Sequence, residues 1–304
     1  MTGGSDLRRW LRLGILVLIL GLFVIPPRGA AAQQAAGPQS VAELTRVADD
    51  VYMFRSIGHN TMFILTDEGV IAMDPIAQVN PRADQLYRAA IASVTDQPVR
   101  YLIYSHEHAD HIEGGAIFAD TAQFVSQRRA AAAIAARNDP RTPVPTVLFD
   151  DHLTLELGGK TVELYYTGRN HTDNSIVLLY PARRLLFAVD FIPVNSLPFR
   201  TLAGDYPDEW IESLRWIEDN LDFDVLVPGH GSLGTRDTPR QVREYFQDLM
   251  AAIRAARARG LADNSPEMID AVRVDLAPKY GSWGNWGPWL PENVQGILRS
   301  WEPR

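Results

Sequence analysis

The sequence predicts an α/β (α+β) fold in which two mixed sheets pack face to face and helices lie outside them. Short runs rich in β-branched and aromatic residues, separated by turn residues, occur in both halves of the chain. These runs form blocks that suit antiparallel pairing, and segments with helical spacing lie between the blocks. No internal repeat of short period is visible.

The first half of the chain contains four strand-like runs and two helical segments. Turn residues at 58–60 and 67–69 separate the first three runs, and the fourth ends directly at Ser105-His106. The predicted strands are 51–54, 61–66, 70–74 and 99–104, and the predicted helices are 81–94, with a proline near its first turn, and the alanine-rich 128–138.

The second half adds two hairpins, one further strand and four helices. Gly158-Gly159 is a two-residue hairpin signal, and Pro181-Ala182-Arg183 turns the second hairpin. The hairpin strands are 153–157 with 161–166 and 175–180 with 184–190, the further strand is 224–227, and the helices are 209–221, 238–259, 266–276 and 291–301.

Composition limits the function. The chain has 304 residues, of which 46% are hydrophobic and 22% charged, a globular balance. Its formal net charge of −8 would repel a phosphate backbone, so a small-molecule substrate is expected and nucleic acid is not. The absence of cysteine excludes disulfides, thiolate metal ligands and a cysteine nucleophile. Any metal must therefore be held by histidine and carboxylate.

Residues 1–32 have the build of a secretory signal peptide. A basic stretch at 8–12 precedes the apolar run 13–25, and Ala30-Ala31-Ala32 offers a cleavage site. The apolar run is shorter than the about 20 residues that a spanning helix needs, so cleavage is expected and a retained anchor is the alternative. The protein is then periplasmic or secreted, without a stable membrane span, and 33–45 is a flexible lead-in.

The strongest functional signal lies directly after the predicted strand 99–104. Three histidines and one aspartate fall within six residues, and side chains on a loop that leaves a strand can turn toward one point. Further histidines lie in polar, glycine-flanked segments at other strand ends, where functional loops are built. The residues concerned are His106, His108, Asp110 and His111, followed later by His171 and His230.

On these residues the chain resembles the metallo-β-lactamase-fold hydrolase superfamily. The resemblance covers the mature domain to about Gly231, and its segments appear in the family's order. They are Val70-Ile-Ala-Met-Asp74-Pro, His106-x-His108-x-Asp110-His111, Gly168-Arg-Asn-His171-Thr-Asp, Phe187-Ala-Val-Asp190 and Val227-Pro-Gly-His230-Gly. The resemblance implies a four-layer αββα sandwich over 46–236 with a metal site at the sheet edges. Residues 237–304 are expected to form C-terminal helices packed on this core.

The resemblance also implies a ligand set for two metal ions. Asp190 would bridge both ions and, with Asp110, is an expected catalytic carboxylate, while Asp74 would accept a hydrogen bond that orients a ligand histidine. Imidazole and carboxylate donors suit zinc first, with two ions per chain, and manganese or iron as alternatives. The first ion would be held by His106, His108 and His171, and the second by Asp110, His111 and His230.

Two metal ions about 3.5–4 Å apart lower the pKa of a shared water towards about 7 and supply a hydroxide nucleophile without serine or cysteine. Asp190 at the bridging position favours the members that hydrolyse esters or thioesters, and export argues against a glutathione thioester. The predicted function is an exported dinuclear hydrolase of a small ester, lactone or related acyl bond. The alternatives are a β-lactam hydrolase, a mononuclear-iron sulfur dioxygenase and a non-catalytic metal-binding accessory protein.

Three other features remain. His59 and Asn60 are expected in an exposed turn near the cleft, with substrate contact as the alternative. The segment 191–207 is expected to form a pocket wall. The stretch Trp283-x-x-Trp286-x-x-Trp289 is expected to pack the terminal helices onto the sandwich, with an apolar substrate wall or partner surface as the alternative.

Overall fold

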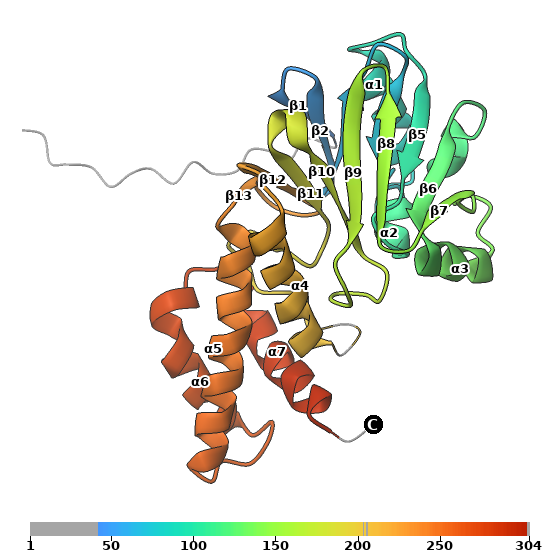
Figure 1. Ribbon diagram of the computed structural model, residues 1–304. Helices are drawn as coiled ribbons and strands as arrows, with labels where there is room; N and C mark the ends of the chain where they lie inside the picture. The colour runs from blue at the N-terminus through green and yellow to red at the C-terminus, as the bar shows by residue number, and fades with distance from the viewer. Residues whose placement is uncertain (1–41, 203, 205, 303–304) are drawn as a thin grey trace, which may run out of the picture. The chain divides into compact units, whose positions relative to one another are not determined.

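The computed structural model describes residues 42–202, 204 and 206–302, and the expected signal segment lies outside them. Within these residues the elements form four layers: helices, a seven-stranded sheet, a six-stranded sheet and a second group of helices (Figure 1). This confirms the αββα sandwich. None of the helices described is both long enough and apolar enough to cross a membrane.

The seven-stranded sheet is mixed. Its first four strands pair antiparallel in chain order, and its last four pair in parallel, which requires crossover connections on the sheet face. The strands are β1 (Glu43–Ala48), β2 (Val51–Ser56), β3 (His59–Leu65), β4 (Val70–Met73), β5 (Val99–Ile103), β6 (Gln123–Gln127) and β7 (Val147–Phe149). The helices of this half are α1 (Ala83–Ala92), α2 (Ala109–Ile112), η1 (Gly115–Phe118) and α3 (Arg128–Arg137).

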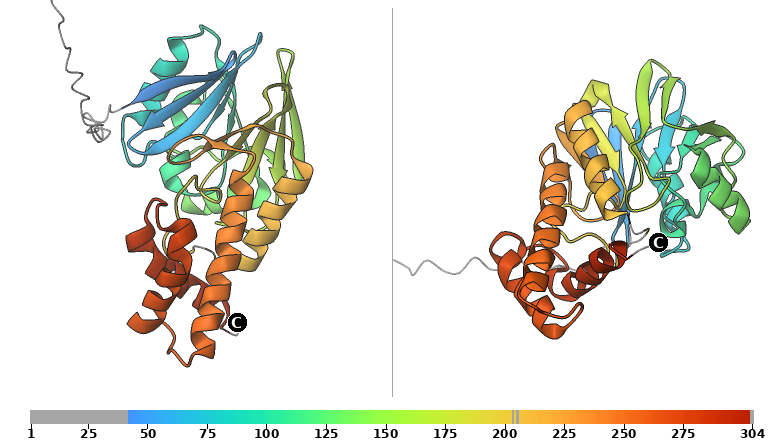
Figure 2. Two further views of the ribbon diagram at one scale, coloured as in Figure 1. Left: turned by 90° about the vertical axis from the view of Figure 1, so that its left-hand side faces the viewer. Right: turned by 60° about the horizontal axis from the view of Figure 1, so that its bottom comes forward.

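The six-stranded sheet is antiparallel except for one parallel pair, β11 with β12, which α4 connects. The helices α4 to α7 contact one another beside this sheet (Figures 1 and 2). The strands are β8 (His152–Leu157), β9 (Lys160–Tyr166), β10 (Ile176–Tyr180), β11 (Leu185–Ala188), β12 (Val225–Pro228) and β13 (Gly234–Thr235). The helices are η2 (Pro181–Arg183), α4 (Pro207–Asn220), α5 (Thr238–Ala258), α6 (Pro266–Tyr280) and α7 (Trp286–Ser300).

The central strands are buried on both faces. In β10, Leu178 belongs to the core between the two sheets, whereas its neighbours Val177 and Leu179 belong to the core under α4 and α5. In β4, Met73 faces the other sheet and Ala72 faces the α1 layer. Successive side chains of a strand point to opposite faces, so strands covered on both sides need unbroken apolar runs.

The structure adds elements that the sequence pattern did not predict. The strand β1 begins at Glu43, inside the segment 33–45 expected to be a flexible lead-in, and β6 and β7 lie between 123 and 149. These strands are short or carry many polar residues, so they lack a strong apolar alternation. The last helix begins at Trp286 rather than at Pro291, and this proline lies inside the helix.

Asp50, in the turn between β1 and β2, joins the two sheets. Its carboxylate accepts hydrogen bonds from Tyr180 Oη at 2.7 Å and Arg183 Nε at 2.6 Å, and Lys160 Nζ lies 3.0 Å from Oδ2. Burial alone would raise the pKa of Asp50, but hydrogen bonds from these three donors outweigh it and hold the pKa at about 2. The charged carboxylate therefore stabilises the fold.

We expect Asp50→Asn to lower the free energy of unfolding at pH 7 by about 2 kcal/mol. In the wild type this stabilisation is fully present above the unfolded pKa of about 4 and is lost as the pH falls through the folded value. Urea unfolding should show that the difference in the free energy of unfolding between the two proteins becomes smaller from pH 7 to pH 3. The control Asp150→Asn, which removes an exposed ion pair with Arg128, should change stability far less, because solvent screens this pair. A difference in unfolding free energy that does not change with pH would contradict the electrostatic explanation.

Candidate metal centre

Both sheets bring their functional loops to one edge. The parallel strands β4 and β5 end beside each other, and so do β11 and β12. The loops after β5, β11 and β12 carry the 106–111 segment, Asp190 and His230. His171 comes from the connection between β9 and β10, and it reaches the same edge because β10 runs antiparallel to β11.

Asn60 ties the two sheets together at this edge. It is fully buried, its backbone N–H donates to the Gly229 carbonyl at 2.7 Å, and its Nδ2 donates to the Pro228 carbonyl at 3.0 Å. A second link runs from the Ile176 N–H to the Ser105 carbonyl at 2.9 Å. The prediction that Asn60 lies in an exposed turn is therefore wrong, because the residue belongs to β3 and packs under the loop from the other sheet.

The first group of donors consists of His106, His108, His171 and Asp190, whose ligand atoms all lie within 4.8 Å of one another. Asp190 Oδ2 is 3.6 Å from His106 Nε2 and 3.4 Å from His171 Nε2. His108 Nδ1 is 3.1 Å from His171 Nε2. The structure thus brings together the three histidines predicted for the first metal and the predicted bridging carboxylate.

The second group contains Asp110, His111 and His230, as predicted, and also His59. Asp190 Oδ1 lies 3.2 Å from His111 Nε2 and 3.1 Å from His230 Nε2. Asp110 Oδ2 lies 3.5 Å from His111 Nε2. The two oxygens of Asp190 therefore face different donor groups, which is the arrangement of a bridging carboxylate.

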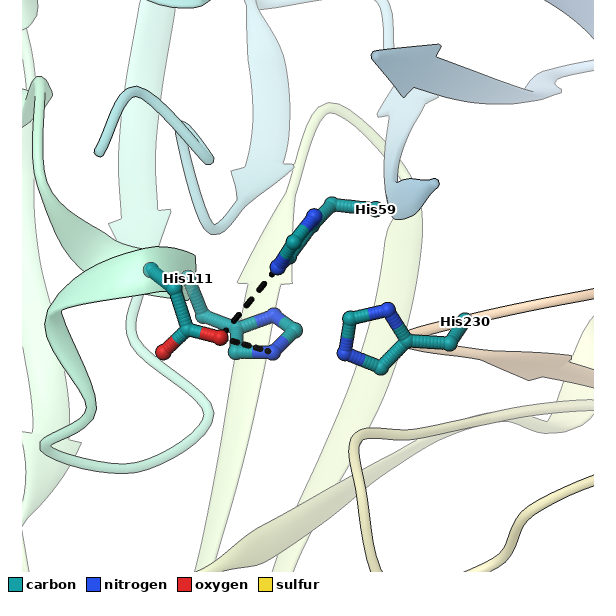
Figure 3. Close-up of side chains that lie close together, drawn as sticks. His59, His111 and His230 are labelled. Atoms are coloured by element: carbon teal, nitrogen blue, oxygen red, sulfur yellow. Dashed lines mark hydrogen bonds and ion pairs between the residues drawn. The ribbon is translucent and has the colours of Figure 1, made fainter. Parts of the chain in front are cut away.

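His59 is the member of the site that sequence reasoning missed. It opens β3, its backbone bridges that of His230, and its side chain is only 12% exposed. Its Nε2 lies 3.2 Å from Asp110 Oδ2. Figure 3 shows the rings of His59, His111 and His230 turned toward one another. The expectation of an exposed turn is wrong for His59 as well, because the turn ends one residue earlier.

Asp190 is held in an uncommon backbone conformation. Its φ is +67°, and the Phe191 N–H donates to the Val189 carbonyl at 2.8 Å, so Asp190 is the centre of a three-residue turn. Trp210 of α4, which is fully buried, donates from Nε1 to the Phe191 carbonyl at 2.8 Å. Strained residues of this kind persist where the surroundings fix them, and they cluster at functional sites.

Asp74 acts on the ligand loop through one intermediate residue. Its Oδ1 accepts the backbone N–H of Ser105 at 2.9 Å, and the Ser105 hydroxyl lies 2.9 Å from His106 Nδ1. The hydrogen bond that Asp74 accepts thus fixes the backbone of the ligand loop, and it reaches the predicted ligand His106 through Ser105. Burial raises the pKa of Asp74 to about 6.

The surroundings set the charges of the donors. Burial lowers the pKa of His106 and brings that of His171 to about 4, so both imidazoles are neutral at pH 7. Burial alone would raise the pKa of Asp190, but the neighbouring His111 outweighs it and holds the pKa well below its usual range. Burial alone would lower the pKa of His111, but the Asp190 carboxylate outweighs it and raises this pKa to about 9. Neutral His106 and His171 beside the ionised Asp190 are thus in the states that metal binding requires, whereas a metal must displace a proton from His111.

Several donor atoms are buried without a hydrogen-bond partner among the residues described. They are His106 Nε2, His111 Nε2 and Asp190 Oδ1. Buried polar atoms almost always have a partner, so inward-facing nitrogens and oxygens of this kind fit a cation between them. The donor chemistry suits zinc, manganese or iron.

A cavity of about 690 Å³ opens over both donor groups. Its lining combines the metal-facing side chains with apolar ones. Among the apolar residues, Phe199 and Trp289 meet edge to face, with ring centroids 5.3 Å apart. The apolar lining residues are Val79, Ile192, Pro193, Val194, Leu197, Phe199, Pro228 and Trp289.

Both expectations for the tryptophan stretch find support. Trp283, Trp286 and Trp289 all pack against the buried core that includes α4 to α7, and Trp289 also lines the cavity. Six residues between 192 and 199 line the cavity, so the expected pocket wall after Asp190 is present.

Comparisons with known proteins agree with this geometry. The model of the metallo-beta-lactamase superfamily matches residues 58–230. The chain is 33% identical over 209 residues to the 2,4-dinitroanisole O-demethylase subunit alpha of Nocardioides sp. (strain JS1661), covering 67% of this chain and 62% of that relative's length. It is 24% identical over 250 residues to the type 2 metallo-beta-lactamase of Bacillus cereus, covering 74% and 94%.

Among solved structures, a metallo-beta-lactamase from Pontibacter korlensis superposes with a TM-score of 0.58 at 22% identity. The match covers 68% of this chain and 99% of that one, and it shows the shared fold. The family model spans more than half of the chain and includes all the predicted ligand loops. The chain therefore belongs to the metallo-beta-lactamase superfamily.

Proposed function

We propose that the protein is a dinuclear metal-dependent hydrolase of a small ester, lactone or related acyl bond. The placement of Asp190 carries the proposal, because Oδ1 faces His111 and His230 while Oδ2 faces His106 and His171. When bound, two metal ions would lower the pKa of a water molecule and polarise the bond under attack. Zinc is the first candidate for both positions.

Residues of the protein itself would hold the reacting groups in place. Asp190 is fixed by its turn and by Trp210, so its two oxygens keep their directions. Asp110 lines the cavity with its side chain 33% exposed, which places it to receive a proton released there. Phe199 and Trp289 add apolar surface to the same cavity.

The lining favours an uncharged substrate with an apolar group. None of the described residues that line the cavity is lysine or arginine, and many of them are aliphatic or aromatic. Apart from bound metal ions, this lining offers no cationic side chain to hold the phosphate backbone of a nucleic acid. A β-lactam carries a carboxylate in addition to the bond under attack, and the lining offers no cationic side chain for it.

The test is purification followed by elemental analysis and a substrate panel. We expect two metal ions per chain and turnover of a neutral lactone or aryl ester in preference to a thioester, a phosphodiester or a cephalosporin. An aryl methyl ether joins the panel because one relative is named an O-demethylase. Oxygen uptake with a persulfide substrate would indicate a sulfur dioxygenase. Full metal loading without turnover of any substrate would indicate an accessory protein and contradict the proposal.

We expect Trp289→Ala to raise KM for aryl esters by about tenfold, because loss of a stacked ring removes about 1–2 kcal/mol of binding. Metal content should stay unchanged, since Trp289 contacts none of the donor residues through a hydrogen bond or ring pair. The matched control is Trp216→Ala on α4, whose ring contacts Tyr165 instead. An equal rise in KM for aryl and small alkyl esters would contradict the assignment of Trp289 to the binding of the aryl group.

We also propose that the protein is exported to the periplasm or secreted, with residues 1–32 removed. The basic stretch, the short apolar run and the Ala-x-Ala site support this proposal. N-terminal sequencing of the protein from its own cells should begin at Gln33. Recovery of the intact N-terminus in the membrane fraction would indicate a retained anchor instead.

A further inference from the structure

We propose that His59 is a metal ligand of the second donor group, beside Asp110, His111 and His230. The inference rests on the metal centre of the proposed function, but not on any substrate. It follows from the hydrogen bonds of the two ring nitrogens of His59 and from their match with those of His230.

His230 shows what the arrangement of a ligand histidine looks like in this site. Its Nδ1 lies 2.9 Å from the Gly58 carbonyl, and a carbonyl only accepts, so Nδ1 carries the hydrogen. The lone pair of Nε2 then faces Asp190 Oδ1 at 3.1 Å. Two acceptors that face each other need a cation between them, and a backbone carbonyl on the other nitrogen is the usual way to orient a metal-ligating histidine.

His59 repeats each of these features. Its Nδ1 lies 3.2 Å from the Ile57 carbonyl, so this nitrogen is again the donor. Its Nε2 lies 3.2 Å from Asp110 Oδ2, a carboxylate oxygen that only accepts when ionised. The ligand atoms of the four residues lie within 4.8 Å of one another.

The hairpin between β2 and β3 is built to hold both rings. Ser56 pairs with His59, so the loop consists of Ile57 and Gly58, whose φ values are +43° and +80°. An isoleucine in this region is strained, since asparagine or glycine is the ordinary choice for such a turn. The Ile57 carbonyl accepts an N–H from His59, and the Gly58 carbonyl accepts one from His230. One turn therefore orients two imidazoles toward the same point, as Figure 3 shows.

The two donor groups would then differ in the number of protein donors. The first has three imidazoles and the shared Asp190, whereas the second has three imidazoles, Asp110 and the shared Asp190. A closed set of protein ligands is typical of a tightly held ion, and an open position is typical of a catalytic one. The second ion should therefore be the more strongly bound.

The test uses full-length protein, purified as isolated, stripped of metal and reloaded with ¹¹³Cd, with its histidines labelled with ¹⁵N. We expect ¹¹³Cd–¹⁵N scalar coupling at His59 Nε2 in the wild type, and one cadmium signal coupled to the imidazoles of His59, His111 and His230. In His59→Ala we expect this cadmium to bind about 100-fold more weakly in a chelator competition, while the other ion stays unchanged. The matched control is His152→Ala, which removes a histidine paired with Glu163 at 2.6 Å outside the site.

A wild-type His59 that shows no coupling to cadmium, with hydrogen on both ring nitrogens, would overturn the inference. His59 would then be an imidazolium that only donates to Asp110. The wild-type coupling decides this even where His59→Ala fails to fold. Protein that couples cadmium to His59 yet hydrolyses nothing supports the inference and contradicts the proposed function, whereas protein that binds no cadmium contradicts both.

Discussion

Asp190→Asn is expected to lower kcat/KM by about 10³-fold or more, which corresponds to about 4 kcal/mol of transition-state stabilisation. The carboxylate has one oxygen toward each donor group, at 3.1 Å to 3.6 Å from the nearest imidazole nitrogens. An asparagine can present an oxygen to only one group, and its amide nitrogen repels a cation at the other. The variant also removes the negative charge that both ions would share. Elemental analysis should show less than two metals per chain.

The variant His108→Ala distinguishes the contributions of the two donor groups in the same metal analysis. His108 belongs only to the first group, so this variant should lose one ion and keep the other, with nearly all hydrolysis gone. Circular dichroism on both variants checks that the fold is intact. Either variant purified with full metal content and full activity would rule out the ligand assignment.

The ligand loops could be predicted because their signal is local. His106, His108, Asp110 and His111 lie within six residues after a strand, and a strand end fixes where a following loop begins. The two-sheet architecture could also be predicted, since β4 and β10 are apolar on both faces and must be covered twice. In each case the neighbouring residues in the sequence carry the information.

The roles of His59 and Asn60 could not be predicted, because they depend on contacts far away along the chain. Asn60 Nδ2 donates to the carbonyl of Gly231, 171 residues later, and His59 meets Asp110 across 51 residues. Locally, Gly58-His59-Asn60 has the composition of a turn. These side chains reach the site only because of the register of β3 against β2 and the packing of the two sheets against each other.

The roles of the three tryptophans could not be predicted either, because they also depend on contacts between distant segments. Three rings spaced by three residues in a glycine-rich segment fit both a packed helix and a substrate wall. The start of α7 at Trp286 places Trp289 in its first turn, where its ring meets that of Phe199 in the cavity lining. An ion pair between Arg200 and Glu292 joins the same two segments. The place of Trp289 in the cavity lining follows from these contacts.

Gly229 lies directly behind the metal centre, before the ligand His230. A Cβ at this position would lie 2.6 Å from Val189 Cγ1, and 3.1 Å from both Asp190 Oδ1 and His111 Cε1. Val189 is buried and β-branched, so it cannot turn away at low cost. The backbone carbonyl of Gly229 is also fixed by the Asn60 N–H at 2.7 Å. The added methyl group must therefore push on Val189 and also shift the side chains of Asp190 and His111 by a few tenths of an ångström.

We expect Gly229→Ala to weaken metal binding at the second group by about 10- to 100-fold and to lower the free energy of unfolding by about 1–3 kcal/mol. Both effects arise because Asp190 and His111 are shifted while their chemistry is unchanged. The matched control is Gly287→Ala in α7, where a Cβ meets no atom within 4 Å, and which should leave metal binding unchanged. Chelator competition and urea unfolding measure the two effects. Wild-type metal affinity in Gly229→Ala would show that the ligands tolerate displacement, and that close packing behind Asp190 does not set the geometry of the centre.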